Sequence, residues 1–379
     1  MLRTRPLFAL LCAFACLLTG CGGSKHATGT VPVPQSVTTR SHDRRDTDVY
    51  SADRAGDLSP VVAGDPALVY VPNSLSDTVT VISQRTLKVL GTFPTGALPQ
   101  HVTPSYDLRT LYVDNDLGNS LTPLDPRTGR PAGKPIPVED PYNLYFTPDG
   151  RYAIVVAERL QKLDFRDPRT MRLVHSLSVA ICRGVDHIDF SADGRYAFAS
   201  CEFSARMIEL DLGTKRVIGS LVLGNGLTSP QDVKLAPNGQ VLYIADQLRG
   251  GVWEVDPSRF RVIGFLHTGA GAHGLYPSRN ARVMYVSNRS AGTISLVSFK
   301  TRHVIKTWQI PPPASPDMGG VSADGTTLWL SGRYNAEVYA IDTRTGRLRA
   351  RIPVGQGPHG LCVWPQPGRY SVGHTGIMR

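Results

Sequence analysis

Residues that could bind a metal ion or transfer a proton recur once in each of seven repeats along the chain. Each repeat contains a short polar motif, such as Asp186-His187 or His273-Gly274. The polar members of these motifs are His101, Asn143, Asp186, His187, Gln231, Asp232, His273, Asp317 and His359. Imidazole and carboxylate groups are ligands of divalent metal ions and can act as general acids and bases. The motifs form one site only if the fold brings the repeats together.

The repeat is set by a hydrophobic strand whose central residue recurs every 42 to 45 positions. The central residues are Tyr70, Tyr112, Ile154, Phe198, Tyr243, Tyr285 and Trp329. A repeat of this length, built from short strands, is typical of a β-propeller blade. The sequence therefore predicts an all-β fold, a seven-bladed β-propeller with four-stranded antiparallel blades. We expect the repeated aromatic residues to pack between blades rather than to bind a cofactor.

The fourth repeat shows the strands of one blade most clearly. From the channel outward, strands are expected near residues 185–190, 196–200, 207–210 and 217–221. Asp193-Gly194, between the first two strands, is a strong hairpin signal. Equivalent turns recur at Asp149-Gly150, Asn238-Gly239 and Asp324-Gly325.

The strands at the repeat centres resemble those of a known group of propellers. The segments at 111–115, 242–246 and 284–288 are similar to the YVTN-type repeats of bacterial and archaeal envelope proteins. The resemblance covers residues 65–376 and implies a propeller of the cell envelope. The repeats also resemble a wider seven-bladed group that includes lactonases, streptogramin lyase and the haem-binding domain of cytochrome cd-type nitrite reductase.

The ends of the repeat array do not coincide with whole blades. The first repeat opens with a second-position strand at 68–71, and the last supplies a spare strand at 360–364. We expect the spare strand to become the innermost strand of the first blade, because an open ring would leave two unpaired sheet edges. Residues 369–379 resemble the opening of a further repeat and are expected to pack nearby.

In a propeller the innermost strands line a central channel, and their first residues ring its mouth. The loops after the second strands lie on the same face, where Arg289 and Arg333 could hold an anionic group. The candidate ligands of a divalent metal ion are Asp186, His187, His273 and His359. His273 and His359 would be the catalytic residues if the protein is an enzyme. The alternative is that these residues only solvate a water-filled channel or tie loops together.

Two cysteines flank the hairpin of the fourth repeat. Cys182 precedes its first strand and Cys201 follows its second, so an antiparallel pairing places them opposite each other. We expect a disulfide, which would stabilise the fold by roughly 3 kcal/mol in the chain-entropy model. Cys362 is expected to be a small buried apolar residue.

The N-terminus carries the pattern of a lipoprotein signal. Arg3 and Arg5 precede an apolar run at 7–18 that is too short to span a bilayer. The following Leu18-Thr19-Gly20-Cys21 resembles a lipobox, which implies lipidation of Cys21. We expect residues 1–20 to be the signal peptide, 21–62 the lipidated cysteine and a disordered tether, and 63–379 the propeller. The alternative is that part of the tether packs against a blade.

Two classes of function follow. The first is a membrane-anchored, extracytoplasmic module that binds a ligand, an envelope protein or a wall component. The second is a divalent-metal-dependent lactonase or lyase with a His/Asp site at the channel mouth. No HExxH, GxSxG, P-loop or CxxCH motif occurs in the sequence. The formal charge is +10 without a Lys/Arg block, so nucleic acid is not an expected partner.

Overall fold

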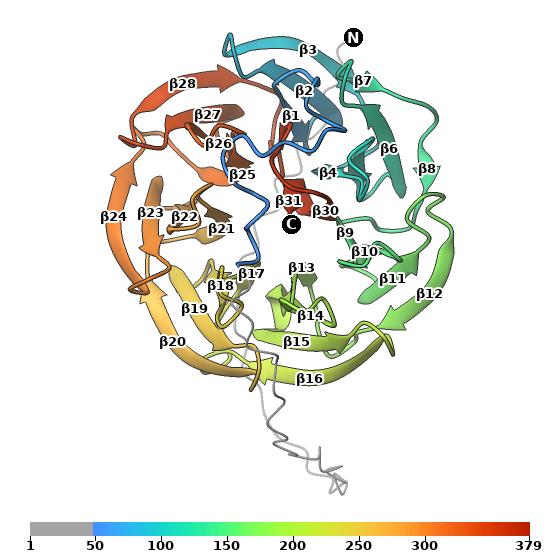
Figure 1. Ribbon diagram of the computed structural model, residues 1–379, viewed down its shortest axis with the longest axis vertical. Helices are drawn as coiled ribbons and strands as arrows, with labels where there is room; N and C mark the ends of the chain where they lie inside the picture. Colours follow the sequence, from blue (N-terminus) through green and yellow to red (C-terminus); the bar gives the residue numbers. More distant parts are fainter. Residues whose placement is uncertain (1–47) are drawn as a thin grey trace, which may run out of the picture. The chain divides into compact units, whose positions relative to one another are not determined.

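The computed structural model describes residues 48–379. The predicted signal peptide, Cys21 and the tether up to residue 47 lie outside the described residues. Seven antiparallel sheets stand around a central channel and form the predicted seven-bladed propeller (Figure 1). Within residues 48–379, no helix has the length and apolarity needed to span a membrane.

The strands of the first three blades follow from the channel outward. Blade 1 contains β29 (Cys362–Trp364), β1 (Leu68–Asn73), β2 (Thr78–Ser83) and β3 (Lys88–Pro94). Blade 2 contains β4 (Pro99–Pro104), β5 (Leu111–Asn115), β6 (Ser120–Asp125) and the short β7 (Arg130–Pro131) and β8 (Ile136–Pro137). Blade 3 contains β9 (Asn143–Phe146), β10 (Ala153–Ala157), β11 (Lys162–Arg166) and β12 (Leu173–Ser178).

The other four blades each have four strands. Blade 4 contains β13 (Val185–Phe190), β14 (Tyr196–Cys201), β15 (Arg206–Asp211) and β16 (Arg216–Val222). Blade 5 contains β17 (Pro230–Leu235), β18 (Leu242–Asp246), β19 (Gly251–Asp256) and β20 (Arg261–His267). Blade 6 contains β21 (Ala272–Pro277), β22 (Val283–Asn288), β23 (Thr293–Ser298) and β24 (His303–Gln309). Blade 7 contains β25 (Pro316–Val321), β26 (Thr327–Gly332), β27 (Glu337–Asp342) and β28 (Leu348–Pro353).

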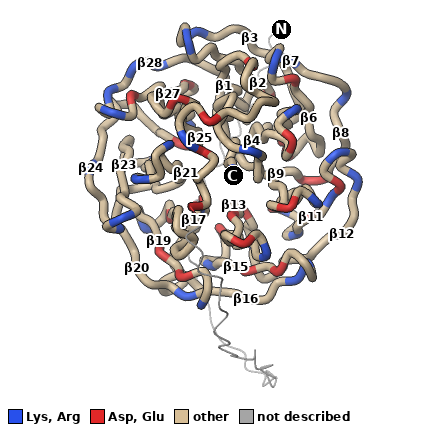
Figure 2. The backbone as a smooth tube through the Cα atoms, in the orientation of Figure 1, with Lys and Arg blue, Asp and Glu red and all other residues tan. Residues whose placement is uncertain are grey.

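The core lies between neighbouring blades. Tyr70 packs with Val102 and Leu111 of the next blade, and Tyr243 packs with Met284. The repeated aromatic residues are therefore packing residues, as predicted. The outermost strands, such as β3, are mostly exposed because no further layer covers them. Lys and Arg are spread around the outer rim of the ring rather than gathered in one patch (Figure 2).

The ring closes as the sequence predicts. β29 pairs antiparallel with β1, with Leu68 opposite Trp364 and Tyr70 opposite Cys362. The chain ends therefore complete one blade between them, and neither end leaves an unpaired inner edge.

The N-terminal described segment runs across three blades on the face that carries the hairpins between first and second strands (Figure 1, blue). Val49 donates its N–H to the Pro237 carbonyl at 2.9 Å, and Tyr50 donates its hydroxyl to the Leu235 carbonyl at 2.8 Å. Farther along, Gly56 donates its N–H to the Ala323 carbonyl at 3.0 Å. Residues 48–62 thus follow the alternative in which part of the expected tether packs against the blades.

The C-terminal segment enters the channel after it has closed the ring (Figure 1, red). β30 (Ser371–Gly373) pairs with the inner edge of β9, a 3₁₀ turn η2 (His374–Gly376) follows, and β31 (Ile377–Met378) folds back on β30. The last residue, Arg379, donates Nη2 to Asp189 at 2.7 Å and lies over the Tyr50 ring. A second 3₁₀ turn, η1 (Glu202–Ser204), follows β14.

Candidate functional site

β-Bulges present the predicted site residues to the channel. In blade 4, Val185 pairs with Cys201 and pairing resumes only at Ile188 with Ala199, so Asp186 and His187 lie in a bulge. The same irregularity covers 231–232, 273–274 and 317–318 in the next three blades. A bulge bends a strand and re-aims its side chains, which explains why consecutive polar residues are tolerated on these inner strands.

A serine on the neighbouring strand compensates for the lost pairing in three of these bulges. The backbone N–H groups of His187, Gly274 and Met318 donate to serine hydroxyls at 3.0, 2.8 and 3.3 Å. The three serines are Ser200, Ser287 and Ser331. The bulges are therefore hydrogen-bonded features of the blades that hold the polar motifs in place.

Five histidines meet inside the channel. The sequence predicted four of them, His101, His187, His273 and His359, and all are at most 3% exposed. The ring centroids of His101 and His359 are 4.9 Å apart, and those of His187 and His273 are 6.1 Å apart. His374 is the fifth, with its ring centroid 4.6 Å from that of His187.

His374 comes from the C-terminal segment and is absent from the sequence-based site. It has a positive φ of 37° and stands beside Gly373, whose φ is 103°. Asn143 Nδ2 lies 3.2 Å from His374 Nδ1, so a predicted ligand-binding residue positions this histidine. A signal was present in the sequence, because His374 is adjacent to a glycine, as are His273 and His359.

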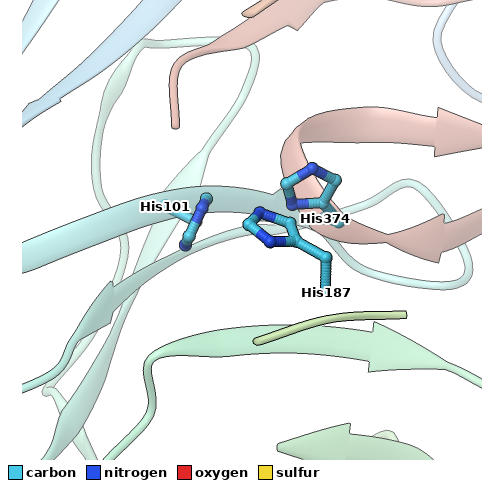
Figure 3. Close-up of side chains that lie close together, drawn as sticks. All are labelled: His101, His187 and His374. Carbon is cyan, nitrogen blue, oxygen red and sulfur yellow. The ribbon is translucent and has the colours of Figure 1, made fainter. Parts of the chain in front are cut away.

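His101, His187 and His374 form a compact triad. Each offers one ring nitrogen, and the three nitrogens lie within 4.8 Å of one another (Figure 3). His101 Nδ1 lies 2.8 Å from the Tyr142 carbonyl. Since a carbonyl only accepts, Nδ1 carries the proton and Nε2 keeps its lone pair. His187 Nδ1 lies 2.7 Å from Asp186 Oδ1.

His273, Asp317 and His359 form a second triad. His273 Nδ1 lies 3.1 Å from Asp317 Oδ1, and His359 Nε2 lies 3.6 Å from Asp317 Oδ2. Arg289 donates from Nε and Nη2 to Asp317 Oδ1, at 2.9 and 2.5 Å. The guanidinium already compensates the carboxylate charge, which makes this triad a weaker metal site than the three imidazoles.

The four predicted metal ligands lie in the same cluster but do not form one set. His187 belongs to the first triad, whereas His273 and His359 belong to the second. Asp186 belongs to neither triad and flanks His187.

Burial dominates the electrostatics of the channel. Desolvation lowers the pKa of His101 to about 3 and that of His187 to about 4. It also lowers the pKa values of the other three channel histidines well below the usual value. These imidazoles are therefore neutral at neutral pH and can act as ligands. Burial, followed by neighbouring carboxylates, raises the pKa of Glu158 to about 9.

The remaining predicted residues are bonded within the protein. Asp232 Oδ2 accepts the Leu275 N–H at 2.8 Å and so links blades 5 and 6, and Asp232 Oδ1 lies 3.6 Å from His374 Nε2. Gln231 donates to Ser229. Arg333 Nη1 donates to the Ser74 hydroxyl at 3.0 Å. These contacts tie neighbouring blades and loops together.

The predicted disulfide is confirmed. Cys182 and Cys201 are bonded, with Cα atoms 4.9 Å apart, and Cys362 is a buried free thiol. Cys201 pairs with Val185, the residue before the bulge of blade 4. The disulfide therefore fixes the backbone that presents Asp186 and His187.

Comparison with known proteins places the chain in a family. A family model described as YNCE-like beta-propeller matches residues 51–367. The chain belongs to the YNCE-like β-propeller family. The uncharacterised protein YncE of Salmonella typhi is 33% identical over 101 residues. That alignment covers 26% of this chain and only 28% of YncE.

Solved structures share the fold of this YNCE-like propeller. Hydrazine synthase of Kuenenia stuttgartiensis matches with a TM-score of 0.64 and 18% identity, over 83% of this chain and 100% of that chain. Dihydro-heme d1 dehydrogenase NirN matches with a TM-score of 0.58 and 15% identity, over 80% of this chain and 75% of that chain. Streptogramin B lyase matches with a TM-score of 0.58 and 13% identity, over 69% of this chain and 85% of that chain. At these identities the likeness shows the fold alone.

The YNCE-like propeller also carries a regular set of exposed apolar side chains. Each stands in the turn after the second strand of a blade, and together we call them the apolar crown. The crown consists of Leu75, Leu117, Leu160, Phe203, Leu248 and Tyr334, which are 50–73% exposed. Five of these residues stand two positions after the strand end; blade 6 has Ser290 there instead. The crown is absent from the sequence-based site, although its residues stand at nearly the same place in six repeats.

Proposed function

We propose that this YNCE-like propeller is a protein-binding module of the cell envelope, anchored to the membrane by a lipid on Cys21. The apolar crown is the surface that binds the partner protein. This proposal combines the position of the lipobox, Leu18-Thr19-Gly20-Cys21, with one structural observation. That observation is the repetition of a large exposed apolar side chain at equivalent turns of six blades.

The regularity of the crown separates it from ordinary surface exposure. Single exposed leucines are common on soluble proteins and need no explanation. Here the exposed residues all occupy turns between second and third strands, which lie on the same face of a propeller. Ile181 and Leu227, on loops between blades that reach the same face, are 50% and 67% exposed. A collection of large apolar groups on one face is typical of an interaction surface.

A protein fits this face better than a bilayer does. Glu158 and Glu202 lie on the same turns as the crown, and both side chains are half-buried. Hydrocarbon placed over these carboxyl groups would remove water without offering a hydrogen-bond partner, which is costly. A partner protein could place a Lys or Arg side chain against them. We therefore propose a partner with an apolar contact surface and a cationic group near its centre.

The proposal is tested by chemical cross-linking and mass spectrometry in intact envelopes. The wild-type protein is compared with a Phe203→Ser/Leu248→Ser variant and with a control, Gln240→Ser, which changes an exposed residue on the opposite face. We expect one protein to cross-link reproducibly to the wild type and the control, to bind it after purification, and to be lost with the crown variant. Equal cross-linking of all three forms, or cross-links to lipid alone, would contradict the proposal.

A second candidate function is metal-assisted hydrolysis or elimination, with His273 and His359 as the proton-transferring residues. The histidine cluster in the channel favours it. The burial of both side chains speaks against it, because only 3% of each is exposed and a lactone cannot reach them in this conformation. Loss of a measurable lactonase or lyase activity in His273→Ala, with the fold intact, would support this candidate.

A further inference from the structure

We propose that the channel binds one divalent transition-metal ion through His101, His187 and His374, and that this ion fastens the C-terminal segment inside the propeller. The site is separate from the apolar crown, so it does not depend on the proposed partner. Its three ligands come from β4, β13 and the turn η2, which are far apart in the sequence (Figure 3).

Each of the three histidines has a buried ring nitrogen that no other described residue satisfies. All three side chains are fully buried. Among the described residues, the Nε2 atoms of His101, His187 and His374 have no hydrogen-bond partner. A buried polar atom without a partner is costly, and several that face one another require an explanation. A metal ion bound between them supplies one.

The groups around the rings have the features of a supporting shell. The Tyr142 carbonyl holds His101 Nδ1, and the Asp186 carboxylate lies beside His187 Nδ1. Carbonyl and carboxylate partners of this kind orient the imidazoles of metal sites. Asn143 contacts the third ring, that of His374. Each of the three imidazoles is therefore located by a separate neighbour.

The formal charges around the cluster also favour a cation. The carboxylates that interact with the channel histidines are those of Asp186, Asp232, Asp317 and Glu202, and the cationic groups are those of Lys234, Arg289 and Arg333. The carboxylates are formally in excess, which favours a bound cation.

The backbone at His374 supports a role beyond packing. His374 has a left-handed φ of 37°, which is unfavourable for a residue with a β-carbon. Gly373 and Gly376 on either side have φ values of 103° and 94°. The backbone of this short segment therefore follows an unusual path, and that path brings the imidazole of His374 into the channel.

Three neutral imidazoles select the class of metal. They suit Zn²⁺, Co²⁺, Ni²⁺ or Cu²⁺ rather than Mg²⁺ or Ca²⁺, which prefer oxygen ligands. Three protein ligands leave a position for water or a fourth donor. Tetrahedral zinc ligands, about 2.1 Å from the ion, stand roughly 3.4 Å apart. The three ring nitrogens lie within 4.8 Å of one another, so they need to approach by on the order of 1 Å when the ion binds.

The test uses the full-length protein, purified in detergent without a polyhistidine tag and stripped with a chelator. Zn²⁺ and Co²⁺ are titrated separately, with bound metal counted by mass spectrometry and Co²⁺ coordination followed by its visible absorption. We expect one ion per chain. His101→Ala and His374→Ala should each weaken Zn²⁺ binding by at least about a hundredfold. The control is His303→Ala, which removes an exposed histidine of β24.

Hydrogen exchange tests the role of the C-terminal segment and does not require a variant within it. Zn²⁺ should slow amide exchange at 371–378 in the wild type but not in folded His101→Ala, whose C-terminal segment is unchanged. His359→Ala separates the two triads, and it should retain Zn²⁺ binding within about tenfold. The proposal is overturned if the wild type binds no ion, if His303→Ala loses the ion equally, or if His359→Ala loses it while His101→Ala does not.

Discussion

Asn143 Nδ2 lies 3.2 Å from His374 Nδ1, although 231 residues separate the two in the sequence. The contact joins the inner strand of blade 3 to the segment that follows ring closure. Several further contacts hold this segment, including the packing of Val372 against Phe190 and the ion pair between Arg379 and Asp189. The C-terminus is therefore part of the channel lining.

The backbone path of the C-terminal segment should require Gly373. Its φ is 103°, and a β-carbon there would lie 2.3 Å from the Leu144 carbonyl oxygen. We expect Gly373→Ala to lower the free energy of unfolding by about 1–3 kcal/mol and to speed amide exchange at 371–378. Gly64→Ala is the matched control, because nothing lies within 4 Å of its β-carbon position. Equal behaviour of the two variants would show that the segment does not require this backbone path.

The disulfide should contribute to stability through the loop that it closes. Cys182 and Cys201 are 19 residues apart. Replacing both with serine should lower the free energy of unfolding by about 3 kcal/mol in the chain-entropy model. Chemical denaturation of the double variant and the wild type measures the difference. Unchanged stability, with the oxidised bond verified in the wild type, would contradict this expectation.

Asp53 should make stability depend on pH. Burial raises the pKa of Asp53 from 3.8 to about 6, although Arg279 opposes the shift. Because the folded-state pKa is the higher one, its contribution to stability is complete below about pH 4 and is lost as the pH rises to about 6. The difference between Asp53→Asn and the wild type should therefore change by up to about 3 kcal/mol over this interval.

Exposed Asp57 provides the control for that pH series. Asp57→Asn should give an unfolding curve parallel to that of the wild type from pH 4 to 6. Asparagine keeps an oxygen that can accept the hydrogen bond from Arg279, so any offset from the altered contact in Asp53→Asn should not vary with pH over this range. Parallel curves for Asp53→Asn and the wild type would refute the assignment.

Arg289 should be required by the buried carboxylate of Asp317. In Arg289→Met, the carboxylate loses both guanidinium hydrogen bonds, and we expect a loss of about 3–5 kcal/mol. A second substitution, Asp317→Asn, should recover part of that loss. Arg216→Met, at an exposed position of β16, should stay within about 0.5 kcal/mol of the wild type. Additive effects of the two buried substitutions would exclude the coupling.

The repeat made the fold predictable because each blade carries the same strand and turn signals. Tyr70 and Trp329 mark equivalent strands, and the spare strand at 360–364 indicates how the ring closes. The channel motifs were also predictable, since Asp186, His273 and Asp317 occupy equivalent places in their repeats. Their division into two triads was not, because it depends on which side chains face each other across the channel.

His374 and the packed segment 48–62 fall outside the repeat. Their positions depend on contacts with distant residues, such as Tyr50 with Leu235, which no local pattern encodes. The crown is different, since Phe203 and Leu248 occupy the same repeat position. The sequence alone does not single out the crown, because one apolar residue in a turn is not informative until the turns are known to lie on one face.

Site-specific photo-cross-linking in living cells tests the protein-binding proposal most directly. A photoreactive residue is placed at Phe203, in the crown, and at Gln240, on the opposite face. We predict that the probe at 203 captures one partner protein, that Leu75→Ser/Tyr334→Ser abolishes the adduct, and that the probe at 240 does not capture this partner. Capture at 240 but not at 203, or adducts with lipid alone at 203, would contradict the crown as a protein-binding surface.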